Sequence, residues 1–337
     1  MTQDLIDGRR PARERPFAPA GYEASRPAFV TPIGDDAIAR ARRLAAGLKR
    51  QLQSSLQPPP VVEAAYLLDE SRSADCPLLE RVRILGLLAS VLDQYFAEQA
   101  PDLIDSTRQE IAVQLDGLLE QALLELNLSI LPDLKREFGI VIGDAKSLET
   151  RQRNHVRRFF RQQLYPMLTP LAVDPGHPFP FISSHSINIL VHLSSPDVRF
   201  GPLSYARIKV PQLMSRFVEV PSEAGERLYI WSEDAVAGFL DELFPGMRIE
   251  NAFLFRVLRA SNAAPSGDAL EARSRGQRHQ QLASPVVRLE YEAAMPDSVI
   301  EWLASHLSVP ATYCFRSDGP LAMLQLVDLA NLAQAGN

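Results

Sequence analysis

The chain has 337 residues, of which 46% are hydrophobic and 23% charged, a balance typical of a globular protein with room for two domains. Its net charge of −6 gives no overall positive field, so an anionic partner would need a local basic patch. Two cysteines are too few for a disulfide scaffold or a thiolate zinc site, and no apolar run suits a signal peptide or a membrane span. We expect a cytoplasmic protein without membrane or nucleic-acid partners.

The N-terminal third of the chain divides into a polar segment and a helical one. Residues 1–34 are rich in arginine and proline and lack apolar periodicity, which predicts a disordered tail. Residues 35–140 then show apolar residues at steps of three and four, which is typical of amphipathic helices. We expect a small helical bundle, with helices over residues 38–56, 61–69, 77–96 and 101–126.

The helical pattern breaks at residues 139–143, and we place a domain boundary nearby. A further helix is predicted over 148–165, capped by Ser147. The segment 164–183 follows with five prolines among large apolar residues, which excludes helix and a central strand and predicts a rigid, extended connection.

Beyond this proline-rich segment the period changes to that of strands. We predict strands over 188–193, 205–210, 217–220, 228–231, 253–258 and 286–291, and helices over 233–243, 269–282 and 298–307. Strands and helices that do not alternate regularly favour an α+β fold. The prediction is an N-terminal helical bundle followed by a mixed α/β domain at 141–326, with a tail at 327–337.

Motifs that carry catalysis are absent from the sequence. It has no phosphate-binding glycine loop, no serine nucleophile elbow and no metal-binding His-Glu-x-x-His helix. None of its six histidines has a second histidine three or four residues away, so a zinc site is not expected. We therefore predict no catalytic residue and no metal ligand.

The predicted helix 148–165 carries the densest basic cluster. By spacing, Arg157, Arg158 and Arg161 share one face, opposite an apolar face. One interpretation is a solvated face of an amphipathic helix. The other is an anion-binding surface, in which arginine forks hold a phosphate-rich ligand such as polyphosphate.

From about Pro77 to Leu329 the chain resembles the type 1 polyphosphate kinases. The resemblance is carried by blocks that occur in the family's order and spacing, such as Pro-Leu-Leu-Glu-Arg-Val-Arg at the start of one helix. The blocks span residues 77–86, 164–183, 206–211, 216–218, 244–246, 255–259, 287–290 and 318–321.

This resemblance implies a helical N-terminal domain over a nucleotide site and a middle, or head, domain that contributes to dimerisation. In the family, ATP and Mg²⁺ are used, and a histidine in a His-x-Lys signature carries the phosphate in two later domains. None of the histidines here has that lysine, so we expect those domains, and any cofactor, to be absent from this chain. Val91 stands where the family has a nucleotide-contacting asparagine, and valine cannot form a side-chain hydrogen bond.

Three functional hypotheses remain open. The leading one is a polyphosphate-kinase-like binding or assembly module that is inactive alone and joins a full-length kinase or a second copy, as a heteromer or a homodimer. The second is one half of a split ATP:polyphosphate phosphotransferase that is active in trans. The third is a degenerate remnant.

Overall fold

The computed structural model describes residues 59–102, 105–173, 179–194, 204–222, 226–261 and 284–335. The tail predicted at 1–34 and the helices predicted over 38–56 and 269–282 lie outside these residues.

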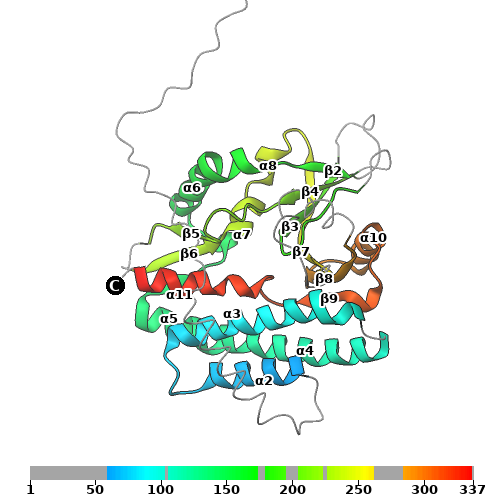
Figure 1. The fold of residues 1–337 in the computed structure, drawn as a ribbon. Coiled ribbons are helices and arrows are strands. Elements are labelled where there is room, and N and C mark those ends of the chain that lie inside the picture. The colour runs from blue at the N-terminus through cyan, green and yellow to red at the C-terminus, as the bar shows by residue number, and fades with distance from the viewer. Residues whose placement is uncertain are drawn as a thin grey trace, which may run out of the picture.

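The first described elements form a layer of helices, which Figure 1 shows beneath the strands. Apolar stripes drive their packing, and the side chains of Leu85 and Leu88 are fully buried. The last helix ends at Gly139, whose φ of 65° is the left-handed conformation that glycine adopts at helix C-termini. The layer comprises α2 (Pro59–Arg72), α3 (Leu78–Gln94), α4 (Asp105–Glu125) and α5 (Leu131–Phe138), with π-helical turns at Tyr95–Gln99 and Leu126–Ile130.

A six-stranded sheet lies above this layer (Figure 1). All its neighbouring strands are antiparallel except the last pair, which is parallel. The first and last strands were not predicted, and the first lies at an edge, where nearby prolines are tolerated. The order is β2 (Leu171–Val173), β4 (Ser204–Lys209), β3 (Ile187–Ser194), β7 (Arg248–Arg259), β8 (Val286–Glu292) and β9 (Cys314–Ser317).

A second, three-stranded sheet connects the two layers. β6 (Arg227–Trp231) lies in its centre, antiparallel to β5 (Phe217–Val220) and parallel to β1 (Ile140–Ile142). Because β1 follows directly on α5, the helical layer is joined to the sheets by a strand where the sequence predicted only a break in the helical pattern.

Helices cover both faces of the six-stranded sheet. One apolar core contains α6 (Thr150–Phe159), its π-helical extension Phe160–Leu164, α7 (Ser232–Ala237) and α8 (Leu240–Leu243). The opposite face packs against α10 (Asp297–Leu307). Short 3₁₀ turns occur at Ala100–Asp102, Ala145–Ser147, Tyr165–Met167, Ala311–Tyr313 and Met323–Gln325.

Three details of the sequence prediction are wrong. The hydroxyl of Ser147 donates to the carbonyl of Asp144, and α6 is instead capped where Gln152 accepts from the backbone of Glu149. The single helix expected over 233–243 is interrupted between α7 and α8. The 3₁₀ turn Tyr165–Met167 lies inside the proline-rich segment, where helical geometry was excluded.

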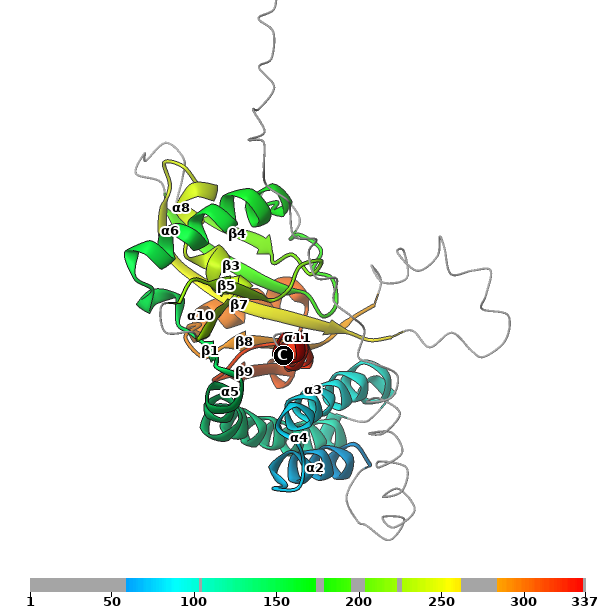
Figure 2. The same ribbon diagram turned by 90° about the vertical axis from the view of Figure 1, so that its left-hand side faces the viewer.

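The tail predicted at 327–337 is also wrong as far as Ala335, because helix α11 (Leu326–Ala335) occupies this stretch and buries Leu329 and Ala333. α11 packs against α3 (Figure 2). A Cβ atom at Gly86 of α3 would lie 3.1 Å from the carbonyl oxygen of Leu324, so glycine permits this close approach.

The fold is the α+β arrangement predicted, with an N-terminal helical region and mixed sheets. One apolar core contains residues of the helices together with Phe217 of β5, Leu258 of β7 and Phe315 of β9. The domain boundary near residue 140 stays a prediction.

Candidate functional site

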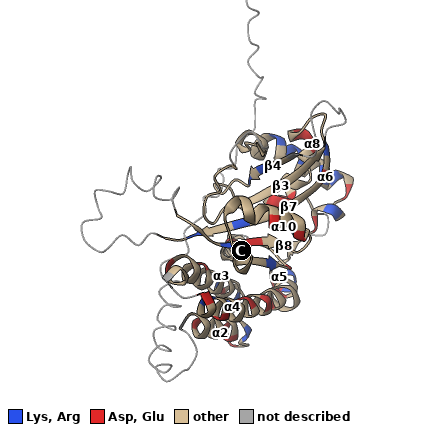
Figure 3. Cartoon of the chain, turned by 90° about the vertical axis from the view of Figure 1, so that its right-hand side faces the viewer, with Lys and Arg blue, Asp and Glu red and all other residues tan. Residues whose placement is uncertain are grey.

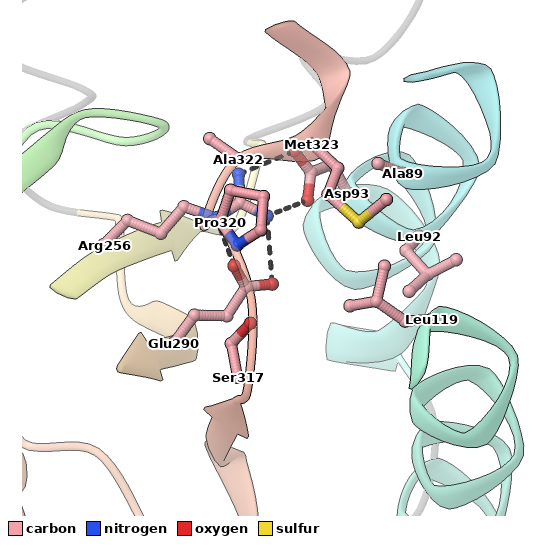
Figure 4. Close-up of a pocket in the computed structure, with 10 residues that line it drawn as sticks. All are labelled: Ala89, Leu92, Asp93, Leu119, Arg256, Glu290, Ser317, Pro320, Ala322 and Met323. Carbon is pink, nitrogen blue, oxygen red and sulfur yellow. Dashed lines mark hydrogen bonds and ion pairs between the residues drawn. The ribbon is translucent and has the colours of Figure 1, made fainter. Parts of the chain in front are cut away.

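A chain of buried charged residues lies where the helical layer meets the six-stranded sheet (Figure 4). Arg256 of β7 donates from Nη1 to Asp93 Oδ2 at 3.0 Å and from Nη2 to Asp93 Oδ1 at 2.7 Å. Arg256 also binds Glu290 of β8 through Nε and, at 2.9 Å, through Nη2. All three residues are at most 5% exposed. The guanidinium therefore joins a helix to two strands.

The chain continues through Arg288, which is 1% exposed. Its Nε donates to Glu290 Oε1 at 2.7 Å and its Nη2 donates to Asp116 Oδ1 of α4 at 2.8 Å. The guanidinium lies over the rings of Phe96 and Phe315, with its carbon 4.6 and 3.8 Å from the ring centroids. Charge pairing and cation–π contact thus offset the cost of burying this cation.

The pKa values follow from this pairing. Burial alone would raise the pKa of Asp93 and of Glu290, but Arg256 and its neighbours hold the pKa of Asp93 well below its usual range and lower that of Glu290. Burial would lower the pKa of Arg256, and the two carboxylates raise it well above its usual value instead. All three groups are therefore fully charged near neutral pH.

A cavity of ≈ 10 Å³ adjoins the network. This volume suits about one water molecule and is far below that of a site for a nucleotide. Figure 4 shows its lining side chains, which come from α3, α4, the strands and the segment before α11. They are Ala89, Leu92, Asp93, Leu119, Arg256, Glu290, Ser317, Pro320, Ala322 and Met323.

His185 lies at the outer end of the network. Its Nδ1 is 3.4 Å from Asp93 Oδ2, and its side chain is 52% exposed. The residue has a φ of 62°, a conformation uncommon outside glycine, and its backbone N–H donates to the carbonyl of Val257. The loop before β3 is thereby fixed to both β7 and α3.

The three arginines proposed to bind anions lie on α6 and its extension. Arg157 and Arg161 both pair with Glu242 of α8, with Nε–carboxylate distances of 3.2 and 2.7 Å. Arg157 also lies over the ring of Phe239. Arg158 is exposed to solvent. Figure 3 shows the basic residues of α6 near acidic positions of α8. Two of the three candidates are therefore engaged by one carboxylate, and binding of anions by this face stays a prediction.

Val91 packs against the apolar core of the helical layer. In the described ranges, no group of three or more histidine, cysteine or acidic side chains is arranged to hold a metal ion. Among the same residues, no helix combines the length and the hydropathy needed to cross a bilayer.

The sequence analysis assigned no role to Asp93, Arg256, Arg288 and Glu290. The signal it overlooked is a charged residue inside an apolar strand pattern, such as Arg256 between Phe255 and Val257. A charge in such a position must be paired to be buried.

These observations define the structural class: an α+β molecule whose helical layer is joined to its sheet by buried ion pairs. A sequence model described as the polyphosphate kinase middle domain matches residues 151–329. The chain belongs to the polyphosphate kinase family.

Relatives with similar sequences are also polyphosphate kinases. The polyphosphate kinase of Prosthecochloris aestuarii is 31% identical over 296 residues, which cover 79% of this chain and 41% of that protein. The polyphosphate kinase of Mycolicibacterium gilvum is 34% identical over 295 residues, covering 80% and 39%. The chain therefore spans about two fifths of the length of these relatives.

A solved structure supports the fold. The crystal structure of polyphosphate kinase from Porphyromonas gingivalis superposes with a TM-score of 0.64 at 22% identity, covering 78% of this chain and 38% of that one.

Proposed function

We propose that this chain is a binding and assembly module of polyphosphate metabolism that, on its own, does not catalyse phosphoryl transfer. The observation that carries this proposal is the mutual pairing of Asp93, Arg256 and Glu290, which are buried at the helix–sheet junction. Arg256 is bound by Asp93 and Glu290, and the adjoining cavity suits one water molecule. Groups bound to one another in this way stabilise an arrangement of elements and are not free to take part in phosphoryl transfer.

The partner in this proposal is a second copy of the chain or a polyphosphate kinase subunit. An exposed apolar edge supports it: Tyr165, Met167 and Leu171 are 45%, 40% and 39% exposed, and Leu171 belongs to the edge strand β2. Apolar side chains beside a sheet edge favour association, because the edge offers backbone hydrogen-bonding groups next to an apolar surface.

A second candidate is the split enzyme. Relatives called polyphosphate kinase align with most of this chain but with about two fifths of their own length, and no histidine here belongs to a His-x-Lys signature. In this candidate a separate polypeptide supplies the histidine, Mg²⁺ and ATP contacts, and polyphosphate is made from ATP only in the mixture.

One experiment tests both candidates. The purified chain is assayed for ATP-dependent polyphosphate synthesis alone and with His-x-Lys polypeptides from its own genome, and complex formation is followed by light scattering. Association without turnover supports the assembly module, whereas turnover only in the mixture supports the split enzyme. Turnover by the chain alone would refute both, and neither association nor turnover would favour a remnant.

A matched pair of variants identifies the surface. Leu171→Asp places a charge on the exposed edge and should abolish association. Leu213→Asp makes the same change at a side chain that is 86% exposed in the segment between β4 and β5, outside strand β2, and should leave association unchanged. Equal behaviour of the two variants would exclude β2 as the assembly surface.

A further inference from the structure

Two cations lie side by side on one face of strand β4. Ala206 and Ile208 of this strand are buried in the core beneath α6 and α7. Because side chains alternate along a strand, Arg207 and Lys209 point to the opposite face. Lys209 contacts Ser183 in the loop that precedes β3, and Arg207 contacts Asn188 within β3 itself.

Arg207 is buried but incompletely paired. It is 6% exposed, and its Nε donates to Asn188 Oδ1 at 2.8 Å. Within the described ranges of the chain this is the one hydrogen bond of its guanidinium, so both amino nitrogens are available as donors. Lys209 Nζ lies 2.9 Å from Ser183 Oγ, which leaves two of its three hydrogens for another acceptor.

A polar frame holds these cations in place. Ser183 Oγ lies 3.1 Å from Ser186 Oγ, which in turn donates to the carbonyl of Ser183 at 2.7 Å. Asn188 Nδ2 donates to the carbonyl of Ser186 at 2.7 Å, and this orients its Oδ1 towards Arg207. The frame uses hydroxyl and amide groups throughout, so it positions positive charge without neutralising it.

The electrostatics of this pair differ from those of other buried arginines. Arg256 and Arg216 are each paired with a carboxylate. Burial lowers the pKa of Arg207 to about 10, and burial together with Arg207 lowers the pKa of Lys209. Among the described residues no carboxylate contacts either cation. An anion placed between the two cations would raise the pKa of both Arg207 and Lys209.

We propose that Arg207 and Lys209 form a binding site for a phosphate oxyanion. Side chains two residues apart on one strand face are separated by about 7 Å at their Cα atoms, so both can reach different oxygens of one tetrahedral anion through charge-assisted hydrogen bonds. This site is separate from the arginines of α6. The ligand class is a phosphate group recognised without a nucleoside, either orthophosphate or the end of a polyphosphate chain; the choice of polyphosphate as first probe rests on the proposed function.

Calorimetric titration with tripolyphosphate at low salt tests the site. We expect Lys209→Gln and Arg207→Gln each to weaken binding about ten-fold or more, the usual effect of losing one charge-assisted hydrogen bond. Arg248→Gln, which removes a cation that is 78% exposed on the same sheet, should bind as wild type. Lack of binding by the wild type, or unchanged binding by a folded Lys209→Gln variant, would overturn the proposal.

Amine labelling supplies a second readout that needs no variant. The chain has four lysines, and Lys135 and Lys146 serve as internal controls. Tripolyphosphate should slow acylation of Lys209 and leave the two controls unchanged. Protection by orthophosphate as well identifies a site for a single phosphate group, and protection by tripolyphosphate alone identifies the chain end. Protection by ATP alone, or none, would overturn the assignment. Since neither experiment depends on a protein partner, failure of this site and failure of the assembly proposal are distinguishable.

Discussion

Replacing Asp93 by asparagine tests whether the buried ion network joins the helical layer to the sheet. Asp93 accepts two charge-assisted hydrogen bonds from Arg256, at 2.7 and 3.0 Å, and is 5% exposed. Removing one member of a buried ion pair costs about 3–5 kcal/mol. Because the amide keeps one acceptor and Glu290 still binds Arg256, we expect a loss of about 3 kcal/mol in the free energy of unfolding.

Urea unfolding monitored by circular dichroism measures this loss. The matched control is Asp318→Asn, which breaks the pair with Arg316 at 2.9 Å, where both side chains are more than 60% exposed. Exposed pairs contribute roughly 0–1 kcal/mol, so the free energy of unfolding of Asp318→Asn should stay close to that of wild type. If Asp93→Asn lost less than about 1 kcal/mol, or no more than the control, the network would not be what joins the two layers.

The same variant has a defined pH dependence. The folded-state pKa of Asp93 lies below the unfolded value of about 3.9. Its contribution to stability is therefore fully present above about pH 5 and is lost as the pH falls through the folded-state pKa. The difference in unfolding free energy between wild type and Asp93→Asn should shrink at acidic pH, and a difference that grows there would contradict the assigned sign.

Three further predictions follow from local geometry. Burial and the carboxylates of Glu233 and Asp144 raise the pKa of Asp234 to about 7, so the protein loses stability as the pH rises from about 4 through 7. The free energy of unfolding of Asp234→Asn should therefore exceed that of wild type by about 2–4 kcal/mol at pH 8, and by little at pH 4. An advantage in urea midpoint that does not grow with pH would disprove this. A Cβ atom at Gly319 would lie 2.5 Å from Leu123 Cδ2, so Gly319→Ala should reduce the free energy of unfolding by about 1–3 kcal/mol and lower the melting temperature. The control is Gly117→Ala, whose Cβ would have nothing within 4 Å and which should raise the melting temperature slightly. Glu242→Gln removes the carboxylate that pairs with Arg157 and Arg161 and should strengthen salt-sensitive polyphosphate binding by this face. Replacing Arg157, Arg158 and Arg161 by alanine should remove the contribution of this face and leave the site at Arg207 and Lys209 unaffected. Unchanged binding in both variants would indicate a solvated face.

The strands that the sequence predicted correctly are continuously apolar or alternate between apolar and polar residues. β5 at Phe217–Val220 matches the prediction, and β3, β4, β6 and β8 differ by a residue or so at their ends. β1 and β2 have three residues each, too few to show a period, and β9 (Cys-Phe-Arg-Ser) does not alternate between apolar and polar residues. Their existence depends on pairing with partners distant in the sequence, as Ile140 with Arg227.

The buried ion network was not predicted from the sequence, because its members are far apart in the chain. Arg256 and Asp93 are 163 residues apart, so no spacing rule connects them. The arginine face of α6 was visible from helical periodicity, but its pairing with Glu242, 81 residues beyond Arg161, was not. Local patterns specify which face a side chain occupies, whereas the identity of its partner depends on the tertiary fold.

The contact between α11 and α3 has a consequence for how the molecule is made. The helices that leave the ribosome first find part of their apolar covering only in residues 326–335, which are synthesised last among the described elements. Contacts between residues so far apart in the sequence slow folding. Until α11 has been synthesised, the N-terminal helices expose part of their apolar surface to solvent. A C-terminal truncation that removes α11 would therefore be expected to favour aggregation during synthesis.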